Sequence, residues 1–196
     1  METNNYQIKL KQVREIAKIL TPSLPYHNFN HALDVSSVAN SLAQLSNVNY
    51  EDLFLLECAA LLHDVVYLPM ASDNEERSAE LARKYLPSIR YSPKETEKIA
   101  KLILATKLPT NPSNLLESII CDADLDNLGR DNFFEKGEKY RQELRIPKEK
   151  WWGIQLQFLK NHQYHTKIAR KLRDAGKLAN IQKLAKLLQE EKNGGE

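Results

Sequence analysis

The feature that most limits how this chain can fold is its longest apolar run, LFLLECAALL, from Leu53 to Leu62. Only Glu57 interrupts it, so a helix here is apolar on most sides and is predicted to be the central buried helix. The run is too short to span a bilayer. His63 and Asp64 follow directly, and a buried Asp is costly unless it is paired or bound to a metal ion. The alternative is a helix-terminal pair that is hydrogen-bonded to the backbone.

Apolar residues recur at helical spacing through most of the remaining chain, and no segment keeps the alternation of a strand. The predicted fold class is therefore all-α. One helix is expected to end at Gly129, because glycine commonly closes helices, and about three or four helices are expected after residue 131. The helices predicted before that residue span 6–20, 32–45, 51–68, 74–86, 93–106 and 115–129.

The 196 residues are enough for one domain with a substantial core. No internal repeat or low-complexity linker divides them. We predict a single helical domain over 1–190, in which the motifs occupy about 25–130 and further helices occupy 131–190. Residues 191–196 are expected to form a frayed tail.

Composition excludes several classes of function. The net charge of +2 is too small to indicate a nucleic-acid partner. Two cysteines, an N-terminus without the pattern of a signal peptide and the lack of a spanning segment favour a cytoplasmic protein that is not bound to a membrane. No glycine precedes Gly129, so glycine-rich phosphate-binding loops are excluded from the first two thirds of the chain.

The segment YHNFNHALDV places two histidines, His27 and His31, at the start of a predicted helix. Asn28 or Asn30 can cap this helix, which places His31 in or near its first turn. The positive end of a helix favours neutral imidazole, the form that binds metal ions. His27 precedes the cap and is therefore expected on a loop at the rim of a site.

A third polar cluster, IICDADLDNLG, contains Asp122, Asp124 and Asp126. A calcium-loop interpretation fails, because Asn127 stands at the sixth position and Phe133 at the twelfth. On a helix, Asp122 and Asp126 share one face, whereas Asp124 points in roughly the opposite direction. At most one of these faces can look toward a single site.

Histidines and carboxylates from these clusters form a mixed set of nitrogen and oxygen donors, which suits manganese, iron, zinc or magnesium. The order H…HD…D across several helices resembles the HD superfamily of metal-dependent phosphohydrolases, from about Pro25 to Arg130. YHNFNHALDV is also similar to the YHNxxHAxDV motif of cyclic-nucleotide phosphodiesterases. HDVVY, SDNEERSAELA, DADLDNLG and FLKNHQYHTKIARKLR look like the small bacterial proteins called predicted metal-dependent HD phosphohydrolases.

The resemblance implies an HD-domain helical bundle and a set of metal ligands. His31 matches the first metal-binding histidine, and His63 with Asp64 matches the HD pair. The last ligand of the superfamily lies in an A-D-hydrophobic element, which here is Asp124, with Asp122 as the alternative.

The resemblance also assigns a catalytic role to His27, which matches the non-ligand histidine that protonates the leaving oxygen in the cyclic-nucleotide enzymes. The alternative is a surface-loop histidine beside Tyr26. Asp64, adjacent to the ion, is expected to orient the attacking water as well. After the HD pair, VVYLPM lacks the further histidine and glycine of those enzymes, so the resemblance extends to their metal site and not to their substrate.

The expected cofactor is one tightly bound divalent ion of manganese, iron, zinc, nickel or magnesium. Some HD enzymes hold a second ion with extra histidines between the HD pair and the final Asp. Here residues 65–123 contain no histidine, and the positive charge of Lys107 would repel a second cation. A second ion could attach only weakly, through Asp64 and waters.

Further residues are candidates for substrate binding. Lys107 and Arg130 are placed to meet a phosphate, although each is more often a solvated surface charge. Glu76 stands in a first helical turn, where the dipole alone favours acids. His162 has a helix–helix polar contact as its alternative role. The full set is Asn28, Glu76, Lys107, Arg130 and His162.

The predicted function is hydrolysis of a nucleotide or another small phosphate ester by a metal-activated water. The alternative is a metal-containing regulatory module that binds a nucleotide with little or no turnover. The expected partner is therefore a small phosphorylated molecule, and a homo-oligomer is a further expectation that the sequence leaves open.

Overall fold

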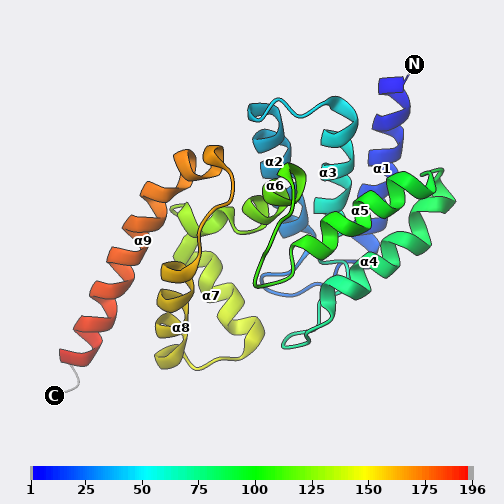
Figure 1. Cartoon of the computed structure of the whole chain (residues 1–196). Coiled ribbons are helices and arrows are strands. Elements are labelled where there is room, and N and C mark those ends of the chain that lie inside the picture. Colours follow the sequence, from blue (N-terminus) through cyan, green and yellow to red (C-terminus); the bar gives the residue numbers. More distant parts are fainter. Residues whose placement is uncertain (1, 194–196) are drawn as a thin grey trace.

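The structure is a computed structural model that describes residues 2–193, with side chains described from residue 6 to residue 190. This part of the chain contains nine α-helices, two short 3-10 helices and no strand, which confirms the all-α prediction. None of the described helices is long and apolar enough to cross a membrane. In chain order the elements are α1 (Glu2–Leu20), α2 (Phe29–Leu45), α3 (Tyr50–Leu62), α4 (Asn74–Tyr85), η1 (Leu86–Ile89), α5 (Pro93–Ala105), α6 (Leu115–Asp124), η2 (Asp126–Gly129), α7 (Phe133–Leu144), α8 (Lys148–Asn161) and α9 (Lys167–Asn193) (Figure 1).

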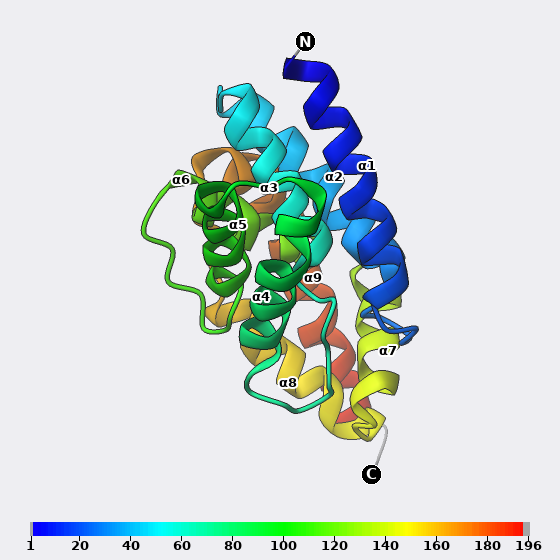
Figure 2. The ribbon, with the colours of Figure 1, turned by 90° about the vertical axis from the view of Figure 1, so that its right-hand side faces the viewer.

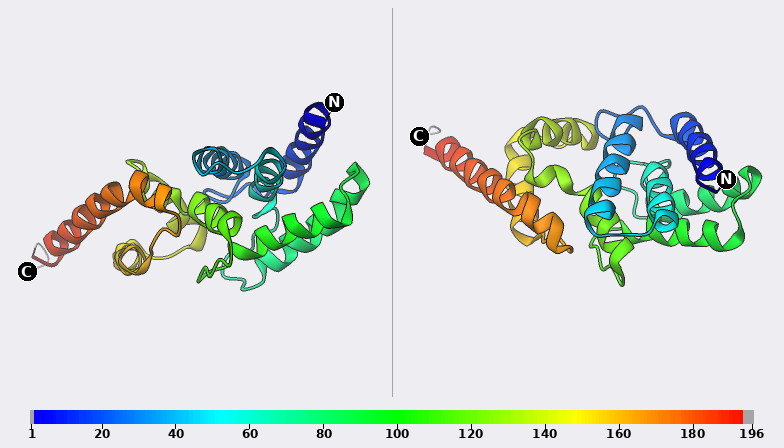
Figure 3. Two further views of the ribbon diagram at one scale, coloured as in Figure 1. Left: turned by 45° about the horizontal axis from the view of Figure 1, so that its top comes forward. Right: turned by 90° about the horizontal axis from the view of Figure 1, so that it is seen from above.

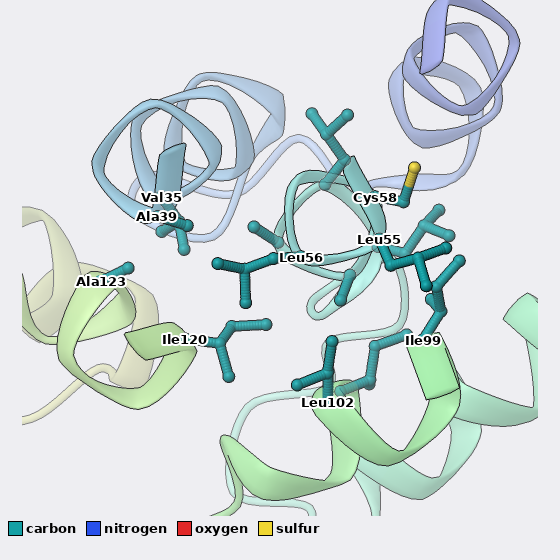
Figure 4. Packing of buried hydrophobic residues seen from close by; sticks show 14 of the residues in the cluster. Val35, Ala39, Leu55, Leu56, Cys58, Ile99, Leu102, Ile120 and Ala123 are labelled. Carbon is teal, nitrogen blue, oxygen red and sulfur yellow. The ribbon is translucent and has the colours of Figure 1, made fainter. Parts of the chain in front are cut away.

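Helix α3 is the centre of the main hydrophobic core, as its apolar sequence predicts. Nine of its 13 residues are buried, and α1, α2, α5 and α6 pack around it (Figure 4). Leu56 points toward α2 and α6, and Leu55 points toward Ile99 of α5. Each fully buried leucine stabilises the fold by about 1.5–3 kcal/mol. The packing of α3 therefore fixes where the residues after its last turn are placed.

Helix α3 ends at Leu62 and does not continue to residue 68 as predicted. After a last turn bond from Val65 N–H to the carbonyl oxygen of Leu62, the backbone donates to side chains of α4. Val66 N–H donates to Ser78 Oγ at 3.1 Å, and Leu68 N–H donates to Asn74 Oδ1 at 2.9 Å. The loop consequently lies against α4, which packs beside α5 on one side of the molecule (Figure 2).

A second, smaller group of buried side chains lies among α7, α8, α9 and η2; we call it the C-terminal cluster. The long helix α9 packs on α8 and η2 and extends away from the rest of the molecule (Figure 3). It continues to Asn193, into the predicted tail, and residues 194–196 of that tail lie outside the described residues. The buried members of the C-terminal cluster are Leu128, Phe133, Trp151, Trp152, Leu159 and Leu184.

The helix predicted over 115–129 is divided in two, because α6 ends at Asp124 and Gly129 is instead the last residue of the 3-10 helix η2. No described glycine has a positive φ, so left-handed backbone is not the reason for glycine here. Gly129 lies in η2 where α9 crosses it, and a Cβ at Gly129 would lie 2.5 Å from the carbonyl oxygen of Arg173. A Cβ at Gly176 would lie 2.1 Å from the carbonyl oxygen of Gly129. The two glycines permit backbone-to-backbone contact between α9 and η2.

Replacing Gly176 by alanine is expected to destabilise the protein, because the new methyl group meets backbone atoms that cannot rotate away. Overpacking of this kind costs about 1–3 kcal/mol. The matched control is Gly153→Ala on α8, where a Cβ meets nothing within 4 Å and should stabilise the helix by about 0.5–1 kcal/mol. Urea denaturation of both variants tests this, and a Gly176→Ala protein as stable as the Gly153→Ala protein would contradict the close approach.

Candidate metal centre

Three helices that pack around one another bring four potential metal ligands together. His31 lies in the first turn of α2, Asp124 is the last residue of α6, and His63 with Asp64 directly follows α3. One donor atom from each of the four lies within 4.8 Å of all the others. His63 Nε2 is 2.9 Å from Asp64 Oδ2, and both histidine Nε2 atoms are 3.3 Å from Asp124 Oδ1. No other cluster of this kind occurs in the part of the chain that the structure describes.

Local hydrogen bonds fix the backbone of His31 and the ring of His63. Asn28 caps α2, because its side-chain oxygen accepts from the backbone N–H of Asn30 at 3.0 Å and of His31 at 3.2 Å. His63 Nδ1 lies 2.8 Å from the carbonyl oxygen of Ala60 and donates a hydrogen bond to it. The other ring nitrogen, Nε2, is therefore the atom that faces the cluster and can bind a metal ion. Asn28, a predicted substrate-binding residue, is thus occupied as a helix cap.

The unpaired atoms of the cluster fit a divalent ion. His31 Nε2 and His63 Nε2 are buried and have no hydrogen-bond partner among the described residues. Buried polar atoms are rarely left unpaired, and a set of two imidazoles and two carboxylates suits a borderline or hard divalent cation. The four residues therefore have the chemistry and the proximity that a metal centre requires.

Burial and charge act against each other in this cluster. Burial alone lowers the pKa of both imidazoles, but the adjacent carboxylates of Asp124 and Asp64 outweigh it, so the pKa of His31 and of His63 is raised. Burial alone raises the pKa of both carboxyl groups, but the neighbouring histidines outweigh it, so the pKa of Asp64 and of Asp124 is lowered. The carboxylates thus attract positive charge, which protons or a metal ion can supply.

Asp122, the alternative final ligand, is used elsewhere. Its two carboxylate oxygens accept hydrogen bonds from the backbone N–H of His165 at 2.7 Å and of Thr166 at 2.8 Å, just before α9 begins. Asp124 is the residue of this segment whose carboxylate enters the cluster. The prediction that the two residues point in opposite directions agrees with this placement.

His27 lies beside the cluster but is buried, contrary to the prediction of a position at the rim. Its Nδ1 forms a short hydrogen bond with Glu143 of α7, and its ring stacks on Tyr67 with the ring centres 3.4 Å apart. These two contacts cover the loop that carries His27, so that the residue is only 8% exposed. Its Nε2 is left free to face the cluster, 3.7 Å from Asp64 Oδ2.

Glu143 is a functional candidate that the sequence did not indicate. Besides His27 Nδ1, its carboxylate accepts from the backbone N–H of Tyr26 at 3.0 Å and of His27 at 2.9 Å. Burial alone raises the pKa of Glu143, but these hydrogen bonds and the His27 charge outweigh it, so its pKa is lowered. Glu143 stands 116 residues after His27, so no local pattern connects the two.

A cavity of about 430 Å³ opens beside the cluster. Asp64, Asp124 and His27 line it, together with apolar side chains of α7 and α8. Lys107 also lines it, and the amine of Lys107 pairs with Glu76, whose pKa is lowered by that amine. Glu76 itself is not part of the lining.

Besides Asn28 and Glu76, two further predicted substrate-binding residues lie outside the cavity. Arg130 is held between two carboxylates, because it donates to Asp34 at 2.9 Å and pairs with Asp126. His162 is packed against Tyr164 and α9, where burial lowers its pKa to about 4. The cavity instead contains Lys136, which pairs with Asp34 and which the sequence did not indicate.

An all-α fold with two histidines and two aspartates clustered at the ends of its core helices defines a class of helical metal-binding domain. Residues 28–126 match the model of the HD domain, and the chain belongs to this family. The narrower similarity to the phosphodiesterase motif stays a prediction.

The fold is similar to that of solved structures from Bacillus subtilis. One is described as YpgQ in complex with ADP, with a TM-score of 0.69 and 15% identity over 92% of this chain and 97% of that chain. A second structure of YpgQ has a TM-score of 0.63 and 19% identity over 92% of this chain and 96% of that chain. No curated protein sequence matches the chain.

Replacing His63 by alanine is expected to abolish metal binding and to lower stability, because the remaining carboxylates lose a partner in a buried site. Elemental analysis after exhaustive dialysis should give about one ion per chain for the unaltered protein and far less for the variant. The matched control is His162→Ala, which removes a histidine outside the cavity and should retain the ion. Full occupancy in the His63→Ala protein would contradict the site.

Proposed function

We propose that this protein is a metal-dependent phosphohydrolase that acts on a nucleotide or a similarly sized phosphate ester. The observation that carries the proposal is the buried His31–His63–Asp64–Asp124 cluster, which borders a cavity of about 430 Å³. That volume falls in the range of sites for small ligands. Two lysines of the same cavity, Lys107 and Lys136, supply positive charge for an anionic substrate.

The four cluster residues would hold the ion. When bound, a divalent ion lowers the pKa of water and offsets negative charge on the phosphoryl group. The cluster offers four donors, and no second group of at least three potential ligands occurs among the described residues. This supports the expectation of one tightly bound ion.

His27 is placed to protonate the leaving oxygen. Its Nε2 faces the cluster, 3.7 Å from Asp64 Oδ2, while Glu143 engages Nδ1. A carboxylate on Nδ1 fixes the orientation of the ring, so that Nε2 is the atom that would donate a proton to the leaving oxygen. His27 is therefore the proposed general acid, and Glu143 is a positioning residue that acts through it.

The nucleotide assignment draws support from the similar fold of YpgQ, one structure of which is described as a complex with ADP. At 15% identity this likeness shows the fold alone, so substrate tests must decide. Turnover of a panel of nucleoside mono-, di- and triphosphates, cyclic nucleotides and sugar phosphates with manganese is expected to reveal hydrolysis. Calorimetric binding of a nucleotide without release of any product would instead indicate a regulatory module.

Replacing His27 by alanine should leave the ion in place and lower the rate by about 10²–10⁴-fold on a substrate with a poor leaving group. The loss should be smaller on a nitrophenyl ester, whose leaving group needs little protonation. Glu143→Gln should show the same dependence on the leaving group to a smaller degree, because the imidazolium loses its charged partner.

The matched control for Glu143 is Glu135→Gln, on the same helix but exposed and paired only with Lys139. It should retain the rate on both substrates. Metal content and circular dichroism should be unchanged in all three variants. Equal losses on natural and activated substrates in the His27→Ala protein would exclude the general-acid role.

A further inference from the structure

The cavity has a second region whose chemistry the phosphohydrolase proposal does not use. Ring contacts lead away from the metal centre along one wall, from His27 to Tyr140 with ring centres 5.2 Å apart, and from Tyr140 to Trp151 with ring centres 5.5 Å apart. Ile154 and Phe158, further along α8, line the same cavity. This wall is aromatic and aliphatic, as expected for a surface that stacks on a planar ring.

Gln155 places one amide in this wall. It follows Trp151 by one helical turn, so both side chains lie on the same face of α8. Gln155 lines the cavity and is only 8% exposed, yet its side chain forms no hydrogen bond with any other described residue. The amide atoms of Gln155 are not among the buried unpaired atoms, so they reach the cavity, where their donor and acceptor are available to a ligand.

We infer that the α8 wall binds the base of a nucleotide and that Gln155 reads the edge of that base. A side-chain amide presents a donor and an acceptor side by side, which is the complement of the adjacent donor and acceptor on a nucleobase edge. Tyr140 and Phe158, which line the cavity and are only partly buried, supply stacking, which every base can use. Gln155 thus distinguishes a nucleotide from a phosphate ester that lacks a base.

The spatial order along the wall agrees with the shape of a nucleotide. The cluster and His27 lie at the start of the ring series, Trp151 lies at its other end, and Gln155 lies one turn along α8 from Trp151. A nucleotide has the same order, with its phosphate and its base separated by a sugar. This inference rests on the proposed function for the identity of the phosphate end, whereas the base end is argued from α8 alone.

The test uses adenosine, guanosine, cytidine and uridine, with ribose as the probe that lacks a base. Free nucleosides carry no phosphoryl group, so their binding depends on neither an ion nor turnover. Calorimetry or nuclear magnetic resonance titration of the full chain should show at least one nucleoside binding more tightly than ribose. Gln155→Leu should lower the affinity for that nucleoside by about 5-fold or more, which is the effect expected from losing a paired amide.

The matched control is Gln157→Leu, the same substitution on an exposed position of the same helix, which should bind as the unaltered protein does. Gln155→Glu preserves the size of the side chain but removes the donor, so it guards against a folding defect and should weaken binding as well. Nucleoside binding that is unchanged in both Gln155 variants, or no tighter than that of ribose, would overturn the inference. Metal-dependent hydrolysis of base-free phosphate esters in that case would leave the phosphohydrolase proposal intact.

Discussion

The burial of His63 and Asp64 at the end of the core helix is the constraint on which the rest of the structure depends. The apolar face of α3 carries these two polar side chains into the interior, where each needs a partner. His31 and Asp124 complete the cluster around them, and both stand at the ends of helices that pack on α3. The packing of the core helices therefore determines the geometry of the site, because any shift of α2 or α6 on α3 moves one of the potential metal-ligand atoms.

The sequence predicted those parts of the structure that depend on local periodicity. The apolar run identified α3, and the expected cap at Asn28 or Asn30, which the structure assigns to Asn28, placed His31 in the first turn of α2. The helical spacing separated Asp122 from Asp124, and the structure gives the two carboxylates different partners. Where a loop backbone finds distant acceptors, as Val66 does at Ser78, the prediction of the helix end was wrong.

Features that arise from contacts between distant segments could not be predicted. Glu143 bonds to His27 across 116 residues, and nothing in the amphipathic pattern of α7 marks this acid among its neighbours. The position of Gln155 could not be predicted either, because a helix face that packs in a core and one that lines a cavity have the same amphipathic sequence pattern. The roles of Arg130 and Lys107 could not be decided from the sequence, since only the fold shows which carboxylate pairs with each side chain.

The two ends of the cavity come from different parts of the chain, and the junction of α9 with η2 joins them in addition to the bonds of α7 to His27 and Asp34. The candidate metal centre belongs to the main core, whereas the wall with Tyr140, Trp151 and Gln155 belongs to α7 and α8 of the C-terminal cluster. Helix α9 packs on both α8 and η2, and η2 follows Asp124 almost directly. Buried Asp126 accepts from Arg173 of α9 at 2.7 Å, beside the contact between Gly129 and Gly176. The wall is thus anchored next to the last residue of the cluster, so substitutions on its inner face can change what the cavity accepts while the four donor atoms keep their places.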